Sequence, residues 1–443
     1  MSFPRYAEYK DSGVEWLEKV PNHWNIYQAR RLFEQRRDSA LPSDEQLSAT
    51  QKYGVIPQTL FMAQEDQKVV LALSGLDNFK HLEADDFVIS LRSFQGGIER
   101  SRYAGCVSPA YTVLRPQKDL VPNYWEYLLK CSSYIAALQT TTEGIRDGKN
   151  ISYTQFGSLS VPLAPETEQT AIATFLDRET AKIDALIAEQ EKLIALLAEK
   201  RQATISHAVT KGLNPNAPMK DSGVAWLGEV PEHWDVVSLK HLVATPITDG
   251  PHETPSFPDE GIPFVSAEAV SGGVINFEKI RGYISREDHL RYSEKYKPQL
   301  HDIYMVKSGA TTGITAIVET EQEFNIWSPL AAIRCDVNKA DPYFVLSALR
   351  SRNFQEGVAL NWSFGTQQNI GMGVLGDLPI AIPSLIEQRE IAQTLSYKLP
   401  KLQELGIEAE FAITLLKERR SALITAAVTG QIDVRNLTPE VPA

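Results

Sequence analysis

Two stretches of the chain carry apolar residues three and four positions apart, which is the period of an α-helix. In residues 166–211 the apolar positions nearly keep a heptad from Leu176 to Leu197, with Glu and Lys between them. Residues 385–428 repeat this pattern. Each stretch therefore predicts long helical structure with one apolar stripe, and the two stripes predict packing of the helices as an antiparallel pair.

A proline stands inside the second helical stretch. Pro400 would cost about 3 kcal/mol in the interior of a helix. Its counterpart 219 positions earlier is Ala181, which follows Thr180, and Thr is a good N-cap residue while Pro is tolerated at the first helical position. We therefore expect each stretch to hold a short helix and then a long one. The expected bounds are about 166–177 and 181–210 in the first stretch, and about 385–396 and 400–428 in the second.

The stretches between the helical blocks, roughly 25–160 and 235–379, are mixed and rich in short strands. Each contains an apolar strand opened by an acid, at residues 86–91 and at residues 302–306, and each strand runs into a loop that contains glycine. A helical piece and a Gly-bearing polar loop follow in both. The two stretches are therefore expected to share a fold despite low identity. The predicted helical pieces are residues 124–138 and 342–354.

An internal repeat frames these two stretches. Residues 10–24 return at residues 220–234 with eleven of fifteen positions identical, including both Trp residues and the Pro-x-His-Trp ending. A Glu-Gln-x-x-Ile-Ala block returns as well, at residues 168–173 and 387–392. A shared frame around dissimilar inserts indicates two domains that do one kind of job on two different targets.

The predicted fold class is α+β: two mixed strand-rich domains separated by an antiparallel pair of long helices, with an internal pseudo-twofold repeat. The expected divisions are an N-terminal segment (1–24), a first strand-rich domain (25–162), a central helical region (163–212), a repeated segment (213–234), a second strand-rich domain (235–381) and a C-terminal helical region (382–443).

The composition is that of a globular protein with several domains. The chain has 443 residues and 43% apolar residues, which is ordinary for a globular protein of two or three domains. Its three cysteines are widely spaced, which fits a reducing compartment and argues against a disulfide framework or a zinc site. The sequence shows neither an N-terminal signal region nor an apolar run long enough to span a membrane, so we expect a cytoplasmic protein.

The charge balance is unusual for a protein that binds nucleic acid. The formal net charge is −12. Residues 22–162 hold 15 Lys and Arg against 15 Asp and Glu, and residues 232–381 hold 12 against 19. A surface for DNA must therefore come from local clustering of basic residues, or partners must supply part of the positive charge.

Catalytic motifs are absent from the sequence. It contains no phosphate loop, no Gly-x-Gly-x-x-Gly and no His-Glu-x-x-His. The nearest string to the Asn/Asp-Pro-Pro-aromatic motif of adenine methyltransferases is Ser108-Pro109-Ala110-Tyr111, which lacks the acid or amide and the second proline. His23 and His233 recur before Trp, and we interpret them as packed or hydrogen-bonded residues. We expect no catalytic residue and no metal site in this chain.

The same order of segments occurs twice in the chain, and this arrangement resembles that of the specificity subunit of Type I restriction–modification systems. The Glu-Gln-x-x-Ile-Ala blocks are similar to the family's entry into its spacer helices. Residues 248–255, Thr-Asp-Gly-Pro-His-Glu-Thr-Pro, resemble a motif that opens many of its target-recognition domains, and Asn150-Ile151 and Asn369-Ile370 resemble the approach to the closing strand. The first variable stretch departs from this pattern, because its residues 48–55 resemble a different domain subtype.

The resemblance implies a protein that reads double-stranded DNA and performs no catalysis itself. Each target-recognition domain would read half of a split sequence, and the helices would set the spacing between the halves. Two modification subunits would dock on the helices, bring S-adenosylmethionine and methylate adenine at N6. Two restriction subunits, where the system has them, would add translocation and cleavage driven by ATP and Mg²⁺. No cofactor is expected in this chain.

Candidate DNA-binding residues follow from the hydrogen-bonding code of the bases, in which Arg grips guanine and Asn or Gln grips adenine. We selected polar residues in or beside the Gly-bearing loops, without separating base contacts from phosphate contacts. In the first domain they are Arg92, Ser93, Gln95, Arg100, Arg102, Arg146, Lys149 and Asn150. In the second domain they are His252, Thr254, Lys307, Ser308, Thr311, Thr312, Gln367 and Gln368.

Two other functions stay open at this stage. A stand-alone DNA-modifying enzyme is disfavoured by the missing cofactor and catalytic motifs, and S-adenosylmethionine binding by the isolated chain would revive it. A coiled-coil scaffold with two protein-binding domains fits the acidic charge better. DNA-binding assays with and without partner subunits distinguish the scaffold from the specificity subunit.

Overall fold

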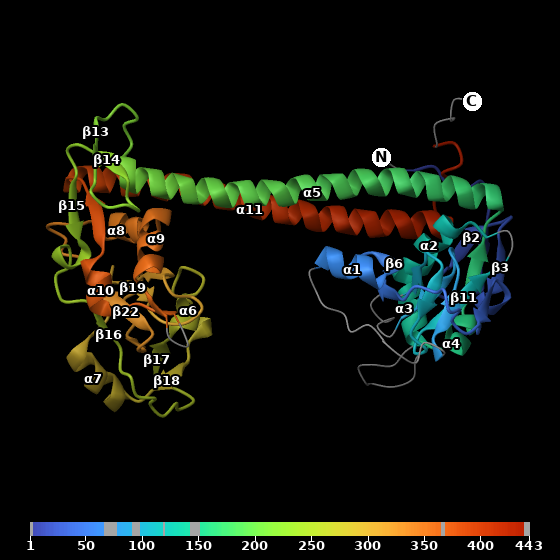
Figure 1. Cartoon of the computed structure of the whole chain (residues 1–443), viewed down its shortest axis with the longest axis horizontal. Coiled ribbons are helices and arrows are strands. Elements are labelled where there is room, and N and C mark those ends of the chain that lie inside the picture. Colours follow the sequence, from blue (N-terminus) through green and yellow to red (C-terminus); the bar gives the residue numbers. More distant parts are fainter. Residues whose placement is uncertain are drawn as a thin grey trace. The chain divides into compact units, whose positions relative to one another are not determined.

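A computed structural model describes residues 3–65, 78–90, 98–117, 120–141, 151–364 and 368–437 of the chain (Figure 1). The chain divides into two units. Unit 1 comprises Met1–Gln190 and Phe411–Ala443, and unit 2 comprises Glu191–Glu410. Both units mix helices with short strands, and both repeat one order of elements, so the predicted α+β class and internal repeat are confirmed.

The elements of unit 1 precede and include the first half of a long helix. They are β1 (Tyr9–Asp11), β2 (Lys19–Pro21), β3 (Asn25–Gln28), η1 (Ala29–Arg31), β4 (Phe33–Arg36), β5 (Leu47–Thr50), β6 (Gly54–Pro57), α1 (Gln58–Glu65), β7 (Lys80–Leu82), β8 (Phe87–Ile89), β9 (Ile98–Arg100), β10 (Gly105–Val107), β11 (Thr112–Pro116), α2 (Pro122–Lys130), α3 (Ser132–Thr140), α4 (Tyr153–Ser158), β12 (Ser160–Leu163) and α5 (Glu166–Lys211).

The elements of unit 2 follow a similar order, with further short helices and a further strand pair, and lead into a second long helix. They are β13 (Met219–Asp221), β14 (Glu229–Pro231), β15 (Asp235–Ser238), η4 (Leu239–His241), β16 (Thr248–Asp249), β17 (Ile262–Val265), α6 (Ala267–Val270), η5 (Phe277–Lys279), β18 (Gly282–Ile284), α7 (Arg286–Lys295), β19 (Ile303–Val306), β20 (Thr315–Ile317), β21 (Asn325–Ile326), β22 (Leu330–Ile333), α8 (Pro342–Arg350), α9 (Arg352–Asn361), β23 (Ser363–Phe364), β24 (Gln368–Asn369), α10 (Met372–Asp377), β25 (Pro379–Ile382) and α11 (Leu385–Val428).

The main sheet of each unit has four antiparallel strands in equivalent order. In unit 1 the order is β4-β11-β8-β9, and in unit 2 it is β16-β22-β19-β20. The strand before each long helix returns to pair with the first strand after the repeated segment, β12 with β3 and β25 with β15. The strands predicted at 86–91 and 302–306 become β8 and β19, the inner strands of these sheets.

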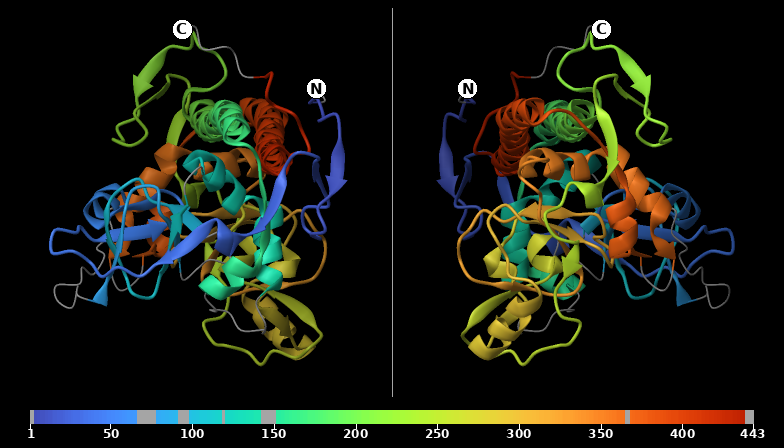
Figure 2. Two further views of the ribbon diagram at one scale, coloured as in Figure 1. Left: turned by 90° about the vertical axis from the view of Figure 1, so that its right-hand side faces the viewer. Right: turned by 90° about the vertical axis from the view of Figure 1, so that its left-hand side faces the viewer.

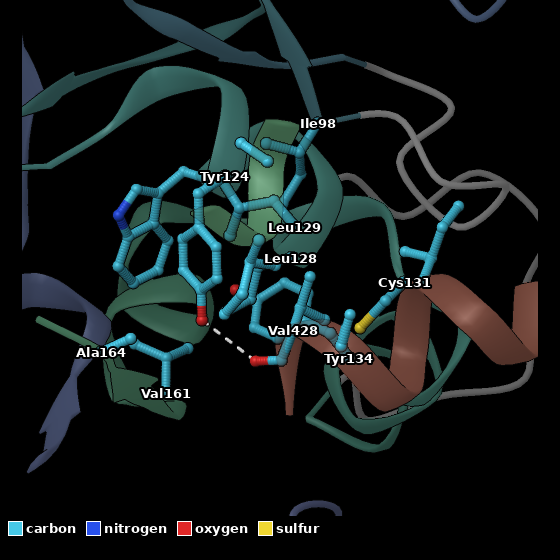
Figure 3. Packing of buried hydrophobic residues seen from close by; sticks show 14 of the residues in the cluster. Ile98, Tyr124, Leu128, Leu129, Cys131, Tyr134, Val161, Ala164 and Val428 are labelled. Carbon is cyan, nitrogen blue, oxygen red and sulfur yellow. Dashed lines mark hydrogen bonds between the residues drawn. The ribbon is translucent and has the colours of Figure 1, made fainter. Parts of the chain in front are cut away.

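Within each unit, half of α5 lies beside half of α11 (Figures 1 and 2). In unit 1 the start of α5 and the end of α11 share one apolar core, which includes Leu176, Ile183, Leu423 and Ile424. The two helices therefore run antiparallel, as predicted. Tyr124 of α2 also reaches this core, where its hydroxyl donates to the Val428 carbonyl at 3.0 Å (Figure 3).

The predicted division of each helical block was wrong, because α5 and α11 are continuous helices of 46 and 44 residues. Thr180 caps nothing, since its hydroxyl donates to the Leu176 carbonyl one turn back in the same helix at 2.7 Å. Pro400 lies inside α11. Leu395 before it and Ala409 after it are both buried, so packing on one helix face offsets the cost of the missing N–H.

The predicted single helical pieces were also wrong, because each is two short helices. α2 gives way to α3 at Cys131, and α8 gives way to α9 at Ser351, where ψ values of 145° and 147° are extended rather than helical. The Ser351 hydroxyl accepts from the Phe354 N–H at 3.1 Å and so caps α9. A side chain that can cap a new helix stabilises such a break.

The repeated motifs meet at the start of each long helix. In unit 1, Glu168 accepts from the Trp24 indole at 3.0 Å and contacts His23 Nε2 at 2.6 Å. In unit 2, Glu387 accepts from the Trp234 indole at 3.1 Å and contacts His233 Nε2 at 2.9 Å. The interpretation of both His residues as hydrogen-bonded is confirmed.

The Gln of each repeated block is buried, with 1% exposure in both units. Gln169 accepts from the Trp125 indole at 3.1 Å and donates to the Ala164 carbonyl at 2.9 Å. Gln388 accepts from the Asp341 N–H at 2.8 Å and donates to the Pro383 carbonyl at 2.9 Å. Each Gln therefore ties a long helix to the loops that precede the short helices of its own unit.

The cysteines and helices can be compared with the expectations about disulfides and membrane spans. Cys106, Cys131 and Cys335 are buried and free, as expected for a chain without a disulfide framework. Across the described ranges, no helix combines the length and apolar character that crossing a membrane requires.

Replacing Gln388 by Ala should lower the melting temperature of the chain. The substitution leaves the Asp341 N–H and the Pro383 carbonyl without their buried partner, which costs about 2 kcal/mol, or about 4–8 °C for a unit of this size. Scanning calorimetry of the full chain measures the shift. Gln393→Ala is the matched control, because Gln393 is exposed on the same helix and should change the transition little. Equal shifts for the two variants would contradict the anchoring role of Gln388.

Candidate nucleic-acid interface

The loop after the inner strand β19 gathers several of the predicted residues of unit 2. The Gly309 N–H donates to the Gln368 carbonyl at 3.0 Å, and the Ile370 N–H donates to the Lys307 carbonyl at 2.9 Å. Thr312 donates its hydroxyl to the Gly309 carbonyl at 2.7 Å, which fixes the turn. These bonds bind residues 307–313 to the hairpin of β23 and β24.

The predicted residues Lys307, Ser308, Thr311, Thr312 and Gln368 therefore stand on one joined pair of loops. Ser308 also forms an isolated bridge with Asn369 of the hairpin. Thr311, Thr312 and Gln368 are partly exposed. Gln367, predicted beside them, lies outside the described residues.

A second loop, which begins at β16, meets Lys307. Asp249 has only 1% exposure, and its carboxylate contacts Lys307 Nζ at 3.1 Å, Lys295 Nζ at 2.7 Å and His252 Nε2 at 3.0 Å. Two of these partners, Lys307 and His252, are predicted residues. The structure thus joins the Asp-Gly-Pro-His motif to the loop after β19, while the predicted Thr254 is exposed farther along the same segment.

The backbone of the motif is held closely to β21. A Cβ atom added to Gly250 would lie 1.9 Å from the Ile326 carbonyl oxygen, so only glycine fits at this position. The Ser328 N–H donates to the Pro251 carbonyl at 3.2 Å, and the Ser328 hydroxyl lies 3.0 Å from His252 Nδ1. The motif therefore presents His252 from a fixed backbone, with 70% of its side chain exposed.

The charge of Asp249 is stabilised by its neighbours. Burial by itself would raise the pKa of its carboxyl group, but the hydrogen bonds and charges of Lys295 and Lys307 outweigh burial and hold the pKa below the ordinary value. Asp249 is consequently ionised at neutral pH, and it fixes two ammonium groups at the edge of the sheet.

Most of the predicted residues of unit 1 lie outside the described residues: Arg92, Ser93, Gln95, Arg146, Lys149 and Asn150. Arg100 and Arg102 are described. Arg100 is 11% exposed and binds Asp85 through Nε at 2.8 Å, with further contacts to Asn123 and Glu126. Arg102 is 67% exposed and contacts Glu126 at 3.3 Å. Arg100 is therefore engaged within the fold, whereas Arg102 faces solvent.

Comparison with known proteins finds similar sequences among Type I restriction enzyme specificity subunits. A family model described as the Type I restriction modification DNA specificity domain matches residues 231–409. The MjaVIII Type I restriction enzyme specificity subunit of Methanocaldococcus jannaschii is 25% identical over 75% of this chain and 76% of its own. The EcoKI specificity subunit of Escherichia coli K12 is 22% identical over 72% and 68%.

Solved structures share the fold over nearly the whole chain. A chain from a structure on complex assembly and conformational transition of the type I R-M system covers 92% of this chain and 98% of its own, with a TM-score of 0.63 and 18% identity. The HsdS subunit of Thermoanaerobacter tengcongensis covers 93% and 98%, with a TM-score of 0.55 and 16% identity.

Residues 231–409 thus contain a Type I restriction modification DNA specificity domain, and the chain resembles Type I specificity subunits in sequence and in fold over most of its length. The scaffold alternative is not better supported by these comparisons. The resemblance found in the sequence is thereby confirmed.

One cation at this site, Lys295, was not among the residues predicted from the sequence. Lys295 ends α7 and lies 46 positions after Asp249, its partner at 2.7 Å. The signal available in the sequence was a group of basic residues in and just after α7, Arg286, Arg291, Lys295 and Lys297, which alternate with acidic residues. Nothing in the sequence indicated which of these side chains reaches the Asp-Gly-Pro-His loop.

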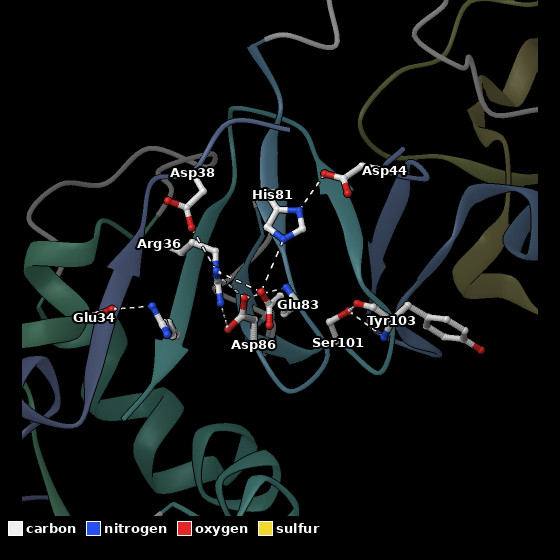
Figure 4. A network of polar contacts seen from close by, with 10 residues as sticks. Glu34, Arg36, Asp38, Asp44, His81, Glu83, Asp86, Ser101 and Tyr103 are labelled. Carbon is white, nitrogen blue, oxygen red and sulfur yellow. Dashed lines mark hydrogen bonds and ion pairs between the residues drawn. The ribbon is translucent and has the colours of Figure 1, made fainter. Parts of the chain in front are cut away.

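In unit 1, ion pairs connect the four-stranded sheet with neighbouring segments. Arg36 of β4 contacts Asp86 at 2.7 Å, and His81 lies between Asp44 and Glu83 (Figure 4). On β9, Glu99 is 2% exposed and pairs with Lys130. Burial raises the pKa of Glu99 to about 7, although Lys130 acts to lower it.

Replacing Glu99 by Gln should change how stability depends on pH. The folded pKa of about 7 lies above the unfolded value of about 4.3. The folded state therefore favours the protonated carboxyl, and the contribution of Glu99 is full below about pH 4.3 and is lost as the pH rises through 7. Glu99→Gln should remove this decline, measured as the melting temperature of wild type minus variant from pH 4.5 to 8. The variant Glu34→Gln, at an exposed carboxylate, is the matched control. A difference for Glu99→Gln that does not change with pH would contradict the raised pKa.

Proposed function

We propose that this chain is a non-catalytic specificity subunit that reads a bipartite double-stranded DNA target, with unit 1 and unit 2 each recognising one half. The observation that carries the proposal is the repeated frame with different loops. Both units build the same four-stranded sheet and the same Glu-Gln anchor, while the loops after β8 and β19 differ in sequence. A common scaffold with variable loops is the usual way to present different recognition residues.

In unit 2 the readers we propose are Thr311, Thr312 and Gln368, on the joined loops at the carboxyl end of β19. Hydroxyl and amide groups there can donate to base edges or accept from them. In unit 1, Arg102 is the described candidate, since Arg100 already binds Asp85, Asn123 and Glu126. The other candidates of unit 1, named from the sequence, stay predictions.

Exchanging a strand-rich domain should change one half of the recognised sequence and leave the other half unchanged. Replacing residues 235–382 by those of another specificity subunit keeps both partners of the β15–β25 pair together, so the anchor of α11 can survive. Methylation-aware sequencing of cells that carry the hybrid reads both half-sites. The reciprocal hybrid at residues 25–163 keeps the β3–β12 pair and should change the other half. Hybrids that alter both halves would contradict independent reading.

We further propose that two modification subunits dock on the long helices and bring S-adenosylmethionine for transfer to adenine N6. Two restriction subunits, where present, would bring ATP and Mg²⁺. Support comes from apolar side chains that the helices leave exposed. In unit 2 these are Leu193, Leu196, Tyr397, Leu405 and Ile407. In unit 1 they are Leu186, Phe411 and Leu415. Exposed apolar side chains grouped in this way mark interaction surfaces. S-adenosylmethionine binding by the isolated chain would contradict this division of labour.

Replacing Ile407 by Lys should weaken assembly with the modification subunits. Ile407 is 57% exposed on α11, so the chain alone should keep its melting temperature, while a buried charge at the interface would cost at least tenfold in affinity. Co-purification and titration of the two proteins measure the loss. Ile407→Leu keeps an apolar side chain and should assemble like wild type. Unimpaired assembly of Ile407→Lys would place the docking surface elsewhere.

A further inference from the structure

Three side chains that can carry positive charge surround the single carboxylate of Asp249. Lys295 and Lys307 place Nζ at 2.7 Å and 3.1 Å from its two oxygens, and His252 places Nε2 at 3.0 Å. Asp249 balances one lysine charge. The cluster of Asp249, His252, Lys295 and Lys307 therefore keeps a net charge of at least +1, in a stretch of the chain that is acidic on balance.

The outer side of this cationic cluster is open to solvent. Lys295 is 51% exposed and His252 is 70% exposed, while Lys307 and Asp249 lie beneath them at 13% and 1%. Beside the cluster, a cavity of about 80 Å³ lies between residues 249–251 and α7. Lysine side chains fixed at one end by a buried carboxylate lose less conformational freedom on binding than free ones.

The nearby guanidinium of Arg291 is already occupied. It contacts Glu253 at 2.7 Å and Asp288 at 2.6 Å. Both ring nitrogens of His252 are in contact too, with Asp249 and Ser328, so the cluster offers ammonium groups and no free planar fork. Ammonium groups act as point charges that suit phosphate oxygens, whereas reading of a base pair favours the paired hydrogen bonds of Arg, Asn or Gln.

We propose that Lys295 and Lys307 form a site for one backbone phosphate of duplex DNA, positioned by Asp249. The inference rests on the proposed function. In it, this cluster binds the DNA backbone, while Thr311, Thr312 and Gln368 contact the bases. Lys307 joins the two parts, since its side chain belongs to the cluster and its carbonyl accepts from Ile370 after the hairpin. This continuity with the reader loops favours DNA over an acidic segment of a partner protein.

The test uses the complete methyltransferase, with duplexes that carry its recognised sequence or a scrambled one. Each phosphate contact adds about 0.9 to the magnitude of the slope of log K against log salt concentration. Lys295→Ala should therefore reduce that magnitude by about 0.9 and weaken binding about fivefold at 0.15 M salt. The loss should be the same on both duplexes, so the specificity ratio stays constant.

Two further variants separate charge from structure. Lys295→Arg keeps the positive charge and should restore the slope. Lys339→Ala removes an exposed lysine that pairs with Asp336 after the far end of β22 and should leave the slope unchanged. The melting temperature of each variant is measured alongside, because a purely structural role of Lys295 would lower it without changing the slope.

Three outcomes would overturn the inference. An unchanged slope for Lys295→Ala would show that Lys295 contacts no phosphate. A changed ratio of affinities for the two duplexes would show that Lys295 contacts a base. Weakened assembly with an unchanged slope identifies an acidic protein partner instead. If the wild-type enzyme fails to distinguish the two duplexes, the proposed function fails, while the slope on scrambled DNA still decides whether the phosphate site exists.

Discussion

Each long helix depends on the Glu-Gln pair in its first turn. The carboxylate of Glu168 or Glu387 receives an indole N–H, and the buried amide of Gln169 or Gln388 satisfies backbone groups of the preceding loop and of the segment before the short helices. A carboxylate in the first turn is also favoured by the helix dipole. Removing the amide would leave buried donors and acceptors unpaired at the junction, so this pair fixes the direction in which the helix leaves its unit.

A second feature shared by the two units holds the start of strands β8 and β19 in place. Asp85 and His301 adopt positive φ values of 73° and 66°, which are uncommon for residues other than glycine. Each is followed by a buried Asp, and these two, Asp86 and Asp302, accept from a backbone N–H three residues back at 2.9 Å and 2.8 Å. Both also bind an arginine, at 2.7 Å. The strain is held by buried ion pairs, and the loops that follow the strand can vary without disturbing it.

The sequence predicted what is local and repeated, and it was wrong where tertiary packing decides. The apolar stripes of α5 and α11 could be predicted because they depend only on residues three and four positions apart in the sequence. The break expected at Thr180 and Pro400 failed, because capping preference is worth about 1 kcal/mol and a buried helix face is worth more. Residue type alone also cannot tell a paired cation from a free one. Arg100 and Arg102 looked equivalent in the sequence, yet only Arg100 is enclosed by Asp85, Asn123 and Glu126.

The acidic balance of the chain and its proposed role are compatible because charge acts locally. At 0.15 M salt, charges more than about 8 Å apart are largely screened, so the net charge of −12 has little influence on a phosphate in contact with Lys295. Acidic residues near the loops have specific partners: Asp249 fixes two lysines, and Glu253 occupies Arg291. Pairing with these acidic side chains thus decides which basic side chains remain available to bind DNA. A weak general attraction to DNA then favours discrimination, since every basic group left free contributes to binding of any sequence.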